Sequence, residues 1–309
     1  MALFSNNTGT LKEIKEQTIK LEKDIQKLTE DNMQTVFGLE FVATEFEHNG
    51  LRLDSVAYDQ TNNAFVIIEY KRDRSFSVVD QGYAYLALLL NNKAEFILLY
   101  NEQTGKQISK ASVDWTQSRV IFVAQNFTIH QQQAINFKDM PIELWQVRQY
   151  SNGSILFNQL KAKDTTESIK TVTKDITVQA VANEVKVYNV SDHFVGSRAE
   201  TISLYEILRE KLMSLAPNVY ENPRGKYIGF SLRENGNDTF VYAHIQVNSI
   251  RLDIPRIRPS DVVDPLNALE YQKNSFESKN TPTSKIHVTN EEDIDYAITI
   301  LRQVLKQKF

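Results

Sequence analysis

The feature that most constrains this chain is a short segment in which a continuous apolar run ends abruptly in charge. Residues 64–68, Ala-Phe-Val-Ile-Ile, are followed directly by Glu69, Tyr70, Lys71 and Arg72. An apolar run of this length, rich in β-branched and aromatic types, is typical of a strand buried on both faces of a sheet. A carboxylate at the end of such a strand is costly unless a partner offsets its charge. The segment therefore predicts a rigid sheet that carries a charged group at its rim.

The charged end of this strand predicts a site. Side chains alternate along a strand, so Glu69 and Lys71 share one face and Tyr70 takes the other. A carboxylate and an amine held side by side suit the binding of a cation and the activation of water. Residues 52–58 read as a neighbouring strand, and the polar residues 59–63 turn from it into the buried strand. A hairpin of these two strands would bring Asp54 close to Glu69.

Composition excludes several kinds of chemistry. The chain of 309 residues contains no cysteine, which rules out disulfides, zinc–thiolate sites and cysteine nucleophiles. The net charge of −4 argues against nucleic-acid binding through bulk charge, while a local basic patch stays compatible with it. No apolar stretch approaches the ~20 residues of a membrane span, and the N-terminus lacks the pattern of a secretory signal. We therefore expect a cytoplasmic protein without a membrane segment.

The alternation of apolar and polar segments predicts an α/β fold with two domains. We expect a first domain over residues 1–160, with a mixed sheet flanked by helices, and a linker over residues 161–196. In the first domain the patterns predict helices at 11–28, either continuous or with a break, and at 78–90 and 129–137. They predict strands at 39–46, 52–58, 64–70, 95–100, 119–124, 142–150 and 154–160.

A smaller α+β domain of unknown function is expected over residues 197–309. Its first helix, over residues 202–215, has Thr201 or Ser203 as its candidate N-cap, and Asn290 is the expected cap of a final helix. Three strands are expected between these helices, at 226–232, 239–246 and 249–254.

Four features of the first domain are candidates for one site. Two carboxylates on adjacent strands, Asp54 and Glu69, can share a divalent cation, and Mg²⁺ needs only one or two carboxylates together with substrate phosphate. The carbonyl of Tyr70 is expected as a further ligand. Lys71 is a point charge that can orient a water or balance negative charge. The other candidates for a catalytic role are Gln81 and Tyr85, which are four residues apart on one helix face, and Glu22 in the first helix.

The triplet Glu69-Tyr70-Lys71 resembles the E-x-K motif of the PD-(D/E)XK, or restriction-endonuclease-like, nuclease superfamily. In that superfamily an Asp and the Glu of E-x-K bind metal, and Asp54 stands at the position of the first acid. The proline that can precede this acid is replaced by Leu53, as is common in the superfamily. The resemblance implies a restriction-endonuclease-like mixed sheet and hydrolysis of DNA phosphodiester bonds with Mg²⁺ or Mn²⁺, in repair or genome defence.

Two further patterns point to branches of this superfamily. Gln81 and Tyr85 form a Q-x-x-x-Y pattern that resembles RecB-type nucleases, and Glu22 with the R-x-D strand at 52–54 resembles the NucS branch. The resemblance covers roughly residues 18 to 125. From about residue 200 the chain resembles an uncharacterised domain that follows such modules in bacterial proteins, some of them labelled "predicted transport protein". The sequence has no membrane segment that would support transport.

Binding of DNA requires cationic side chains, and five arginines are candidates. We expect phosphate contacts from Arg52, Arg72, Arg251, Arg256 and Arg258. Two rival functions stay open: a non-catalytic nucleic-acid or protein binding module on the same fold, and another hydrolase that uses the two acids. The sequence has no G-x-S-x-G and no Walker A motif, so serine-nucleophile chemistry and ATP use are not indicated. A homodimer is left open as the oligomeric state.

Overall fold

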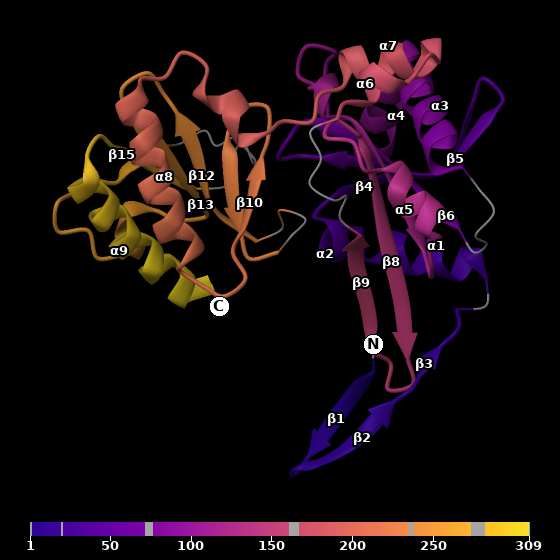
Figure 1. The fold of residues 1–309 in the computed structure, drawn as a ribbon, viewed down its shortest axis with the longest axis horizontal. Coiled ribbons are helices and arrows are strands. Elements are labelled where there is room, and N and C mark those ends of the chain that lie inside the picture. Colours follow the sequence, from indigo (N-terminus) through magenta and orange to yellow (C-terminus); the bar gives the residue numbers. More distant parts are fainter. Residues whose placement is uncertain are drawn as a thin grey trace. The chain divides into compact units, whose positions relative to one another are not determined.

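The apolar segment that ends in charge is a strand, β6 (Ala64–Lys71), and Ala64–Tyr70 are buried along it. In the computed structural model it belongs to one of two compact units, shown in Figure 1. Unit 1 comprises Met1–Asp59 and Asn63–Val187, and unit 2 comprises Tyr188–Phe309 with Gln60–Asn62. The structure describes residues 2–308 apart from residues 20, 72–76, 161–166, 234, 235, 237 and 273–281.

Unit 1 is built on a mixed sheet, as the sequence predicted. Its strand order is β3-β8-β7-β6-β5-β4, and β9 also pairs with β8. The pairs β6–β7 and β7–β8 are parallel and the other pairs are antiparallel. Besides β6, the strands of this sheet are β3 (Glu16–Gln17), β4 (Glu40–His48), β5 (Leu51–Asp59), β7 (Arg119–Ala124), β8 (Ile142–Tyr150) and β9 (Ile155–Leu160).

Helices cover both faces of this sheet, which is why residues 64–68 of β6 are all apolar. Phe65 and Ile67 of β6 pack on one face with α3 (Val78–Asn91), α4 (Lys93–Thr104) and α7 (Ile176–Glu184). Val66 and Ile68 pack on the other with α1 (Glu22–Asp31) and α2 (Met33–Phe37). The short helices α5 (Ile129–Ala134), α6 (Ile169–Val172) and η1 (Trp115–Gln117) complete the unit.

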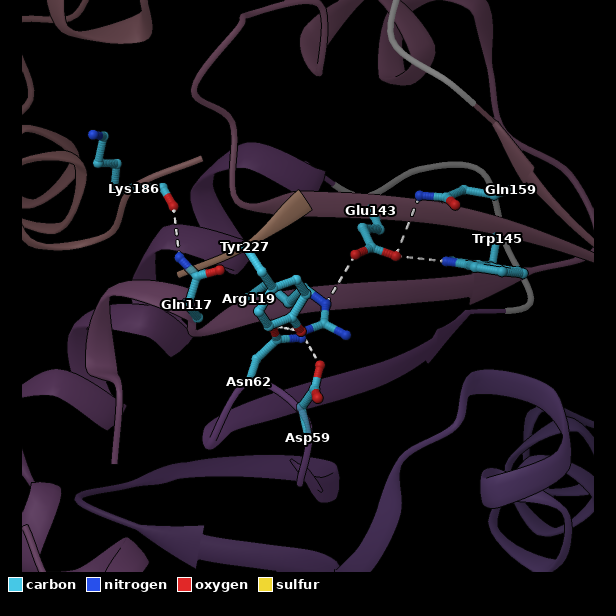
Figure 2. A network of polar contacts seen from close by, with 9 residues as sticks. All are labelled: Asp59, Asn62, Gln117, Arg119, Glu143, Trp145, Gln159, Lys186 and Tyr227. Atoms are coloured by element: carbon cyan, nitrogen blue, oxygen red, sulfur yellow. Dashed lines mark hydrogen bonds and ion pairs between the residues drawn. The ribbon is translucent and has the colours of Figure 1, made fainter. Parts of the chain in front are cut away.

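A buried ion network braces the sheet (Figure 2). Arg119, the first residue of β7, places Nη1 3.0 Å from Asp59 Oδ2 and Nε 2.9 Å from Glu143 Oε1. The second Glu143 oxygen accepts hydrogen bonds from Trp145 Nε1 at 2.9 Å and Gln159 Nε2 at 3.3 Å. The two carboxylates hold the pKa of Arg119 above its ordinary value even though burial lowers it. The network ties β5, β7, β8 and β9 together.

Two predicted elements of unit 1 are wrong. Residues 11–28 do not form one helix: β1 (Leu3–Asn7) and β2 (Thr10–Ile14) make a hairpin that extends from the rest of the unit, and α1 begins only at Glu22 (Figure 1). Residues 95–100 are not a strand but the middle of α4, which buries Phe96 and Tyr100 one turn apart and ends at Gly105 in a left-handed conformation.

The expected linker over residues 161–196 also differs from the structure in part. Its residues 161–166 lie outside the described ranges. The following helices α6 and α7 pack Ile169, Val178 and Val181 into the core of unit 1. The division between the units therefore falls between Val187 and Tyr188, within the expected linker.

Unit 2 is a six-stranded antiparallel sheet with two helices against one face (Figure 1). Arg198, rather than Thr201 or Ser203, is the N-cap of α8, while the Asn290 side chain accepts a hydrogen bond from Asp293 N at 2.9 Å, as predicted. The elements are η2 (Val190–Phe194), α8 (Ala199–Met213), β10 (Tyr220–Pro223), β11 (Ile228–Ser231), β12 (Thr239–Ile245), β13 (Ile250–Pro255), η3 (Pro259–Asp261), β14 (Glu270–Gln272), β15 (Thr283–Val288) and α9 (Glu291–Lys308).

A search of the described helices for a membrane span found none with the necessary length and apolar character.

Candidate active site

Glu69 is the centre of a polar cluster at the end of β6. Its side chain is buried, and its Oε1 atom lies 2.5 Å from Lys71 Nζ and accepts a hydrogen bond from Gln81 Nε2 at 2.8 Å. The alternation predicted from the sequence is therefore present, with Glu69 and Lys71 on the same face. Within the described part of the chain, the other oxygen, Oε2, is buried without a hydrogen-bond partner. A buried, unpaired carboxylate oxygen is a position that a cation would satisfy.

Asp54 lies beside this cluster. The pairing of β5 with β6 runs to Ser55 opposite Ile68, and one further step in this register puts Asp54 opposite Glu69. At this position the Asp54 side chain, rather than a main-chain carbonyl, bonds the main chain of β6: its Oδ2 accepts a hydrogen bond from Tyr70 N at 2.9 Å. Strand pairing thus brings together two carboxylates that are fifteen residues apart in sequence.

The electrostatics of Asp54 reflect this crowding. Burial, followed by the negative charge of Glu69, raises the pKa of Asp54 to about 6. The Tyr70 N–H and the Lys71 ammonium oppose the rise, and the carboxylate of Glu22 adds to it. Two carboxylates that repel each other in this way are electrostatically unfavourable when both are ionised, unless a cation offsets their charge. The proximity of Glu22 also brings the predicted helical acid to this end of the sheet.

Helix α3 supplies the amide and the phenol of the cluster. Gln81 Nε2 reaches the Tyr85 hydroxyl at 2.7 Å as well as Glu69, and the Tyr85 hydroxyl donates a long hydrogen bond to the Arg52 carbonyl at 3.4 Å. Burial, and then the charge of Glu69, raises the pKa of Tyr85, so the phenol stays protonated. The single amide of Gln81 therefore bridges β6 to its own helix.

Two residues set the position of α3. Ser77 is the N-cap and accepts a hydrogen bond from Asp80 N at 3.3 Å. Gly82, next to Gln81, allows a close approach to the sheet, because a Cβ there would lie 2.6 Å from Ile142 Cδ1 and 3.5 Å from Phe122 Cε2. A larger residue at position 82 would push the helix, and with it Gln81, away from β6.

The donors fit a hard divalent cation, although the described residues contain no group of three or more His, Cys, Asp or Glu side chains arranged for a metal. Mg²⁺ takes oxygen ligands and keeps several waters, so two carboxylates suffice. Asp54, Glu69 with its unpaired Oε2, and the carbonyl of Tyr70 provide oxygen donors at one strand end. The chain has no cysteine, so no thiolate is available to favour a soft metal there.

A second polar cluster, which the sequence did not reveal, supports the site from the side of α1. Gln26 of α1 donates to Glu30 and to the carbonyl of Asp54, while Glu30 accepts from Ser55, which is also paired with the Tyr70 hydroxyl. The only sequence signal for it is the spacing of Glu22, Gln26 and Glu30, four residues apart, which places the three on one helix face.

Comparison with known proteins identifies a relative over the whole chain. An uncharacterised protein of Haemophilus influenzae (strain ATCC 51907 / DSM 11121 / KW20 / Rd) is 36% identical over 307 residues, a match that covers 99% of this chain and 100% of the relative. This chain belongs to the family of that protein. Residues 190–304, most of unit 2, match the model of a domain of unknown function, DUF5655.

Two solved structures resemble part of the chain. One is a repair endonuclease from Pyrococcus abyssi, 16% identical, with a TM-score of 0.23 over 39% of this chain and 45% of that chain. The other is the EndoMS–dsDNA2 complex, 17% identical, with a TM-score of 0.23 over 38% of this chain and 43% of that chain. Both matches span less than half of the solved chain.

The arginines expected to bind phosphate are divided between the two units. Arg52 is exposed on β5 and lies 3.9 Å from Glu45, and Arg72 lies outside the described residues. In the DUF5655 region, Arg251 makes two hydrogen bonds to the buried carboxylate of Asp253, at 2.8 and 3.1 Å. Arg256 and Arg258 follow β13 and are exposed.

Proposed function

We propose that unit 1 is a metal-dependent nuclease of the PD-(D/E)XK type that hydrolyses phosphodiester bonds in DNA. The observation that carries this proposal is the meeting of two strands and a helix at Glu69, whose Oε1 contacts both Lys71 and Gln81 while Oε2 stays unpaired. The register of β5 on β6 supports the same site, because it puts Asp54 opposite Glu69, and the charge of Glu69 contributes to the raised pKa of Asp54. The residues proposed to act together are Glu22, Asp54, Glu69, Lys71, Gln81 and Tyr85.

The chemistry divides among these side chains. Asp54, Glu69 and the Tyr70 carbonyl would hold Mg²⁺ or Mn²⁺, which when bound lowers the pKa of a water and offsets charge on phosphate. Lys71 is held at the site by its ion pair with Glu69, and its ammonium orients the attacking water or balances negative charge in the transition state. Gln81 fixes the Glu69 carboxylate and the Tyr85 hydroxyl relative to each other.

The test is a cleavage assay on the full chain. Single-stranded, duplex and branched DNA are incubated with Mg²⁺, with Mn²⁺ and with EDTA, and cleavage is expected with either metal and none with EDTA. Lys71→Ala should lower the cleavage rate about 10²-fold or more while DNA affinity, measured in Ca²⁺, stays unchanged, because Lys71 acts in the transition state. Lys110→Ala, at an exposed position on another part of unit 1, is the matched control and should cleave normally.

Glu69→Gln separates metal binding from the rest of the machinery. The variant keeps the size of the side chain but removes the charge, so metal affinity and activity should fall together. DNA binding that is indifferent to Mg²⁺, with no cleavage in the wild type, would instead favour a binding module on this fold. Equal cleavage by the wild type, Lys71→Ala and Glu69→Gln would show that another site or a contaminant cleaves the DNA.

A further inference from the structure

Helix α1 presents a polar stripe to the strands of the candidate site. Glu22, Gln26 and Glu30 are spaced four residues apart, so they lie on one face of the helix. Gln26 is 9% exposed, and its Nε2 atom is surrounded by three oxygens: Glu30 Oε1 at 3.0 Å, Thr44 Oγ1 at 3.0 Å and the Asp54 carbonyl at 3.1 Å. A carbonyl and a carboxylate can only accept, so the nitrogen rather than the oxygen of this amide must face them.

The stripe continues across the sheet through a chain of hydroxyls. Ser55 Oγ donates to Glu30 Oε1 at 2.6 Å, and the hydroxyls of Ser55 and Tyr70 lie 3.1 Å apart. Burial raises the pKa of Tyr70, which keeps its hydroxyl protonated. Because side chains alternate along a strand, Ser55 and Tyr70 occupy the face opposite Asp54 and Glu69. Each proposed metal ligand thus has a chain neighbour that α1 holds.

We propose that Gln26 is a positioning residue that fixes the Asp54 peptide so that the Asp54 carboxylate stays on the Tyr70 N–H, beside Glu69. The proposal rests on the proposed function of the site. Two neighbouring carboxylates repel each other, and a strand end that is free to twist would let them separate. The hydrogen bond from Gln26 to the Asp54 carbonyl prevents that twist from the main-chain side, while Tyr70 N holds the carboxylate itself. Residues that orient metal ligands act in this way in metal sites generally.

The test replaces Gln26 by methionine, which has a similar shape and helix propensity but no donor. Gln131→Met is the matched control, since Gln131 is an equally buried amide of unit 1 that bonds Thr128 instead. We expect Gln26→Met to reduce Mn²⁺ affinity and kcat by about 10- to 100-fold, with KM for DNA changed by less than about threefold. Gln26→Glu, which keeps the length but loses the donor, should lose at least as much. The control should match the wild type in all three quantities.

A second readout needs neither metal nor DNA. Hydrogen exchange of the Tyr70 amide, followed by NMR, should be about tenfold faster or more in Gln26→Met than in the wild type, relative to amides of β7, because the Tyr70–Asp54 hydrogen bond is weakened. Unchanged Tyr70 exchange together with unchanged Mn²⁺ affinity would overturn the role of Gln26. A wild type that binds no Mn²⁺ and cleaves no DNA would refute the proposed function, and Tyr70 exchange would still decide whether Gln26 holds Asp54.

Discussion

Replacing Asp54 by asparagine should make unit 1 more stable at neutral pH while it removes activity. The Asp54 pKa is raised from its ordinary value of 3.8 to about 6 in the folded state, first by burial and then by the charge of Glu69. Between these two pH values the unfolded chain has already released the proton that the folded chain still binds. Stability from this group is therefore fully present below about pH 3.8 and is lost as the pH rises through 6.

The size of the effect follows from the two pKa values. Each pH unit of difference corresponds to 1.36 kcal/mol, so ionised Asp54 lowers the free energy of unfolding by at most about 3 kcal/mol at pH 7.5. Asparagine keeps an oxygen that can accept from Tyr70 N but has no charge to bury or to oppose Glu69. Asp54→Asn should gain up to this amount at pH 7.5, and the gain should shrink toward zero near pH 4.

The chain offers a probe confined to the right unit. Its two tryptophans, Trp115 and Trp145, are both buried in unit 1. Urea unfolding followed by tryptophan fluorescence at pH 4.5, 6 and 7.5 therefore reports the stability of unit 1 in the full chain. Adding Mn²⁺ should raise the stability of the wild type, because the cation binds the folded state, and should have little effect on Asp54→Asn.

Two results would refute this reasoning. A variant less stable than the wild type at pH 7.5 would mean that the Asp54 carboxylate is well compensated by its neighbours. A gain that is the same at pH 4.5 and pH 7.5 would mean that the effect comes from packing rather than from ionisation. Glu102→Asn, which removes a carboxylate at an exposed position on α4, is the control for a general change in charge and should show no such pH dependence.

Three further predictions concern the charged groups outside the site. Arg119→Met should lower the free energy of unfolding of unit 1 by about 3 to 5 kcal/mol, measured by tryptophan fluorescence, because it leaves Asp59 buried without its partner, and an unchanged midpoint would exclude this. If unit 2 contacts DNA phosphates, Arg256→Ala with Arg258→Ala should reduce the slope of log K against log salt by about 0.7 to 0.9 per contact, for all sequences alike, and an unchanged slope would remove these arginines from DNA binding. Arg251→Ala should instead destabilise unit 2, since Asp253 loses two hydrogen bonds.

The centre of the fold was predictable because a strand that is buried on both faces has a continuous apolar sequence. The apolar run of β6 and the strand expected over residues 52–58 were readable in the sequence, and they correspond to β6 and β5 of the mixed sheet. The helix expected over residues 78–90 corresponds to α3. The sequence thus predicted which residues of β5, β6 and α3 would meet at the strand ends.

The errors arose where local pattern and tertiary structure disagree. The segment Glu95–Tyr100 is a short apolar run that fits a strand or a helix equally well, and packing of Phe96 and Tyr100 against the sheet selects the helix. Between Leu11 and Leu28 the apolar spacing fits a helix throughout. In the structure the first part pairs with Leu3–Asn7, because a strand partner became available that a single segment cannot reveal.

In the candidate site, too, the sequence identified some of the residues and missed others. Asp54, Glu69 and Lys71 were identified from strand register and spacing, both of which are local. The support from Gln26 was not, because it depends on a side chain that reaches the main chain of Asp54 across 28 residues of sequence, and an isolated glutamine on a helix carries no sign of that contact. Residues that orient other residues are selected by three-dimensional geometry and leave little pattern in one sequence.

Near Glu69, the polar groups on one face of the sheet are hydrogen-bonded, whereas those on the other face are not all paired. This difference explains how Asp54 and Glu69 can stay close together although they repel each other. On the face of α3, Asp54 and Glu69 repel each other, and one oxygen of Glu69 is unpaired. On the face of α1, Gln26 and Ser55 both donate hydrogen bonds to the carboxylate of Glu30, and the Ser55 hydroxyl is also paired with that of Tyr70. This hydrogen-bonded network holds β5 and β6, the same two strands that carry Asp54 and Glu69 on their other face. The strands therefore cannot relax by separating, so the repulsion is relieved by protonation of Asp54 or, under the proposed function, by a bound cation.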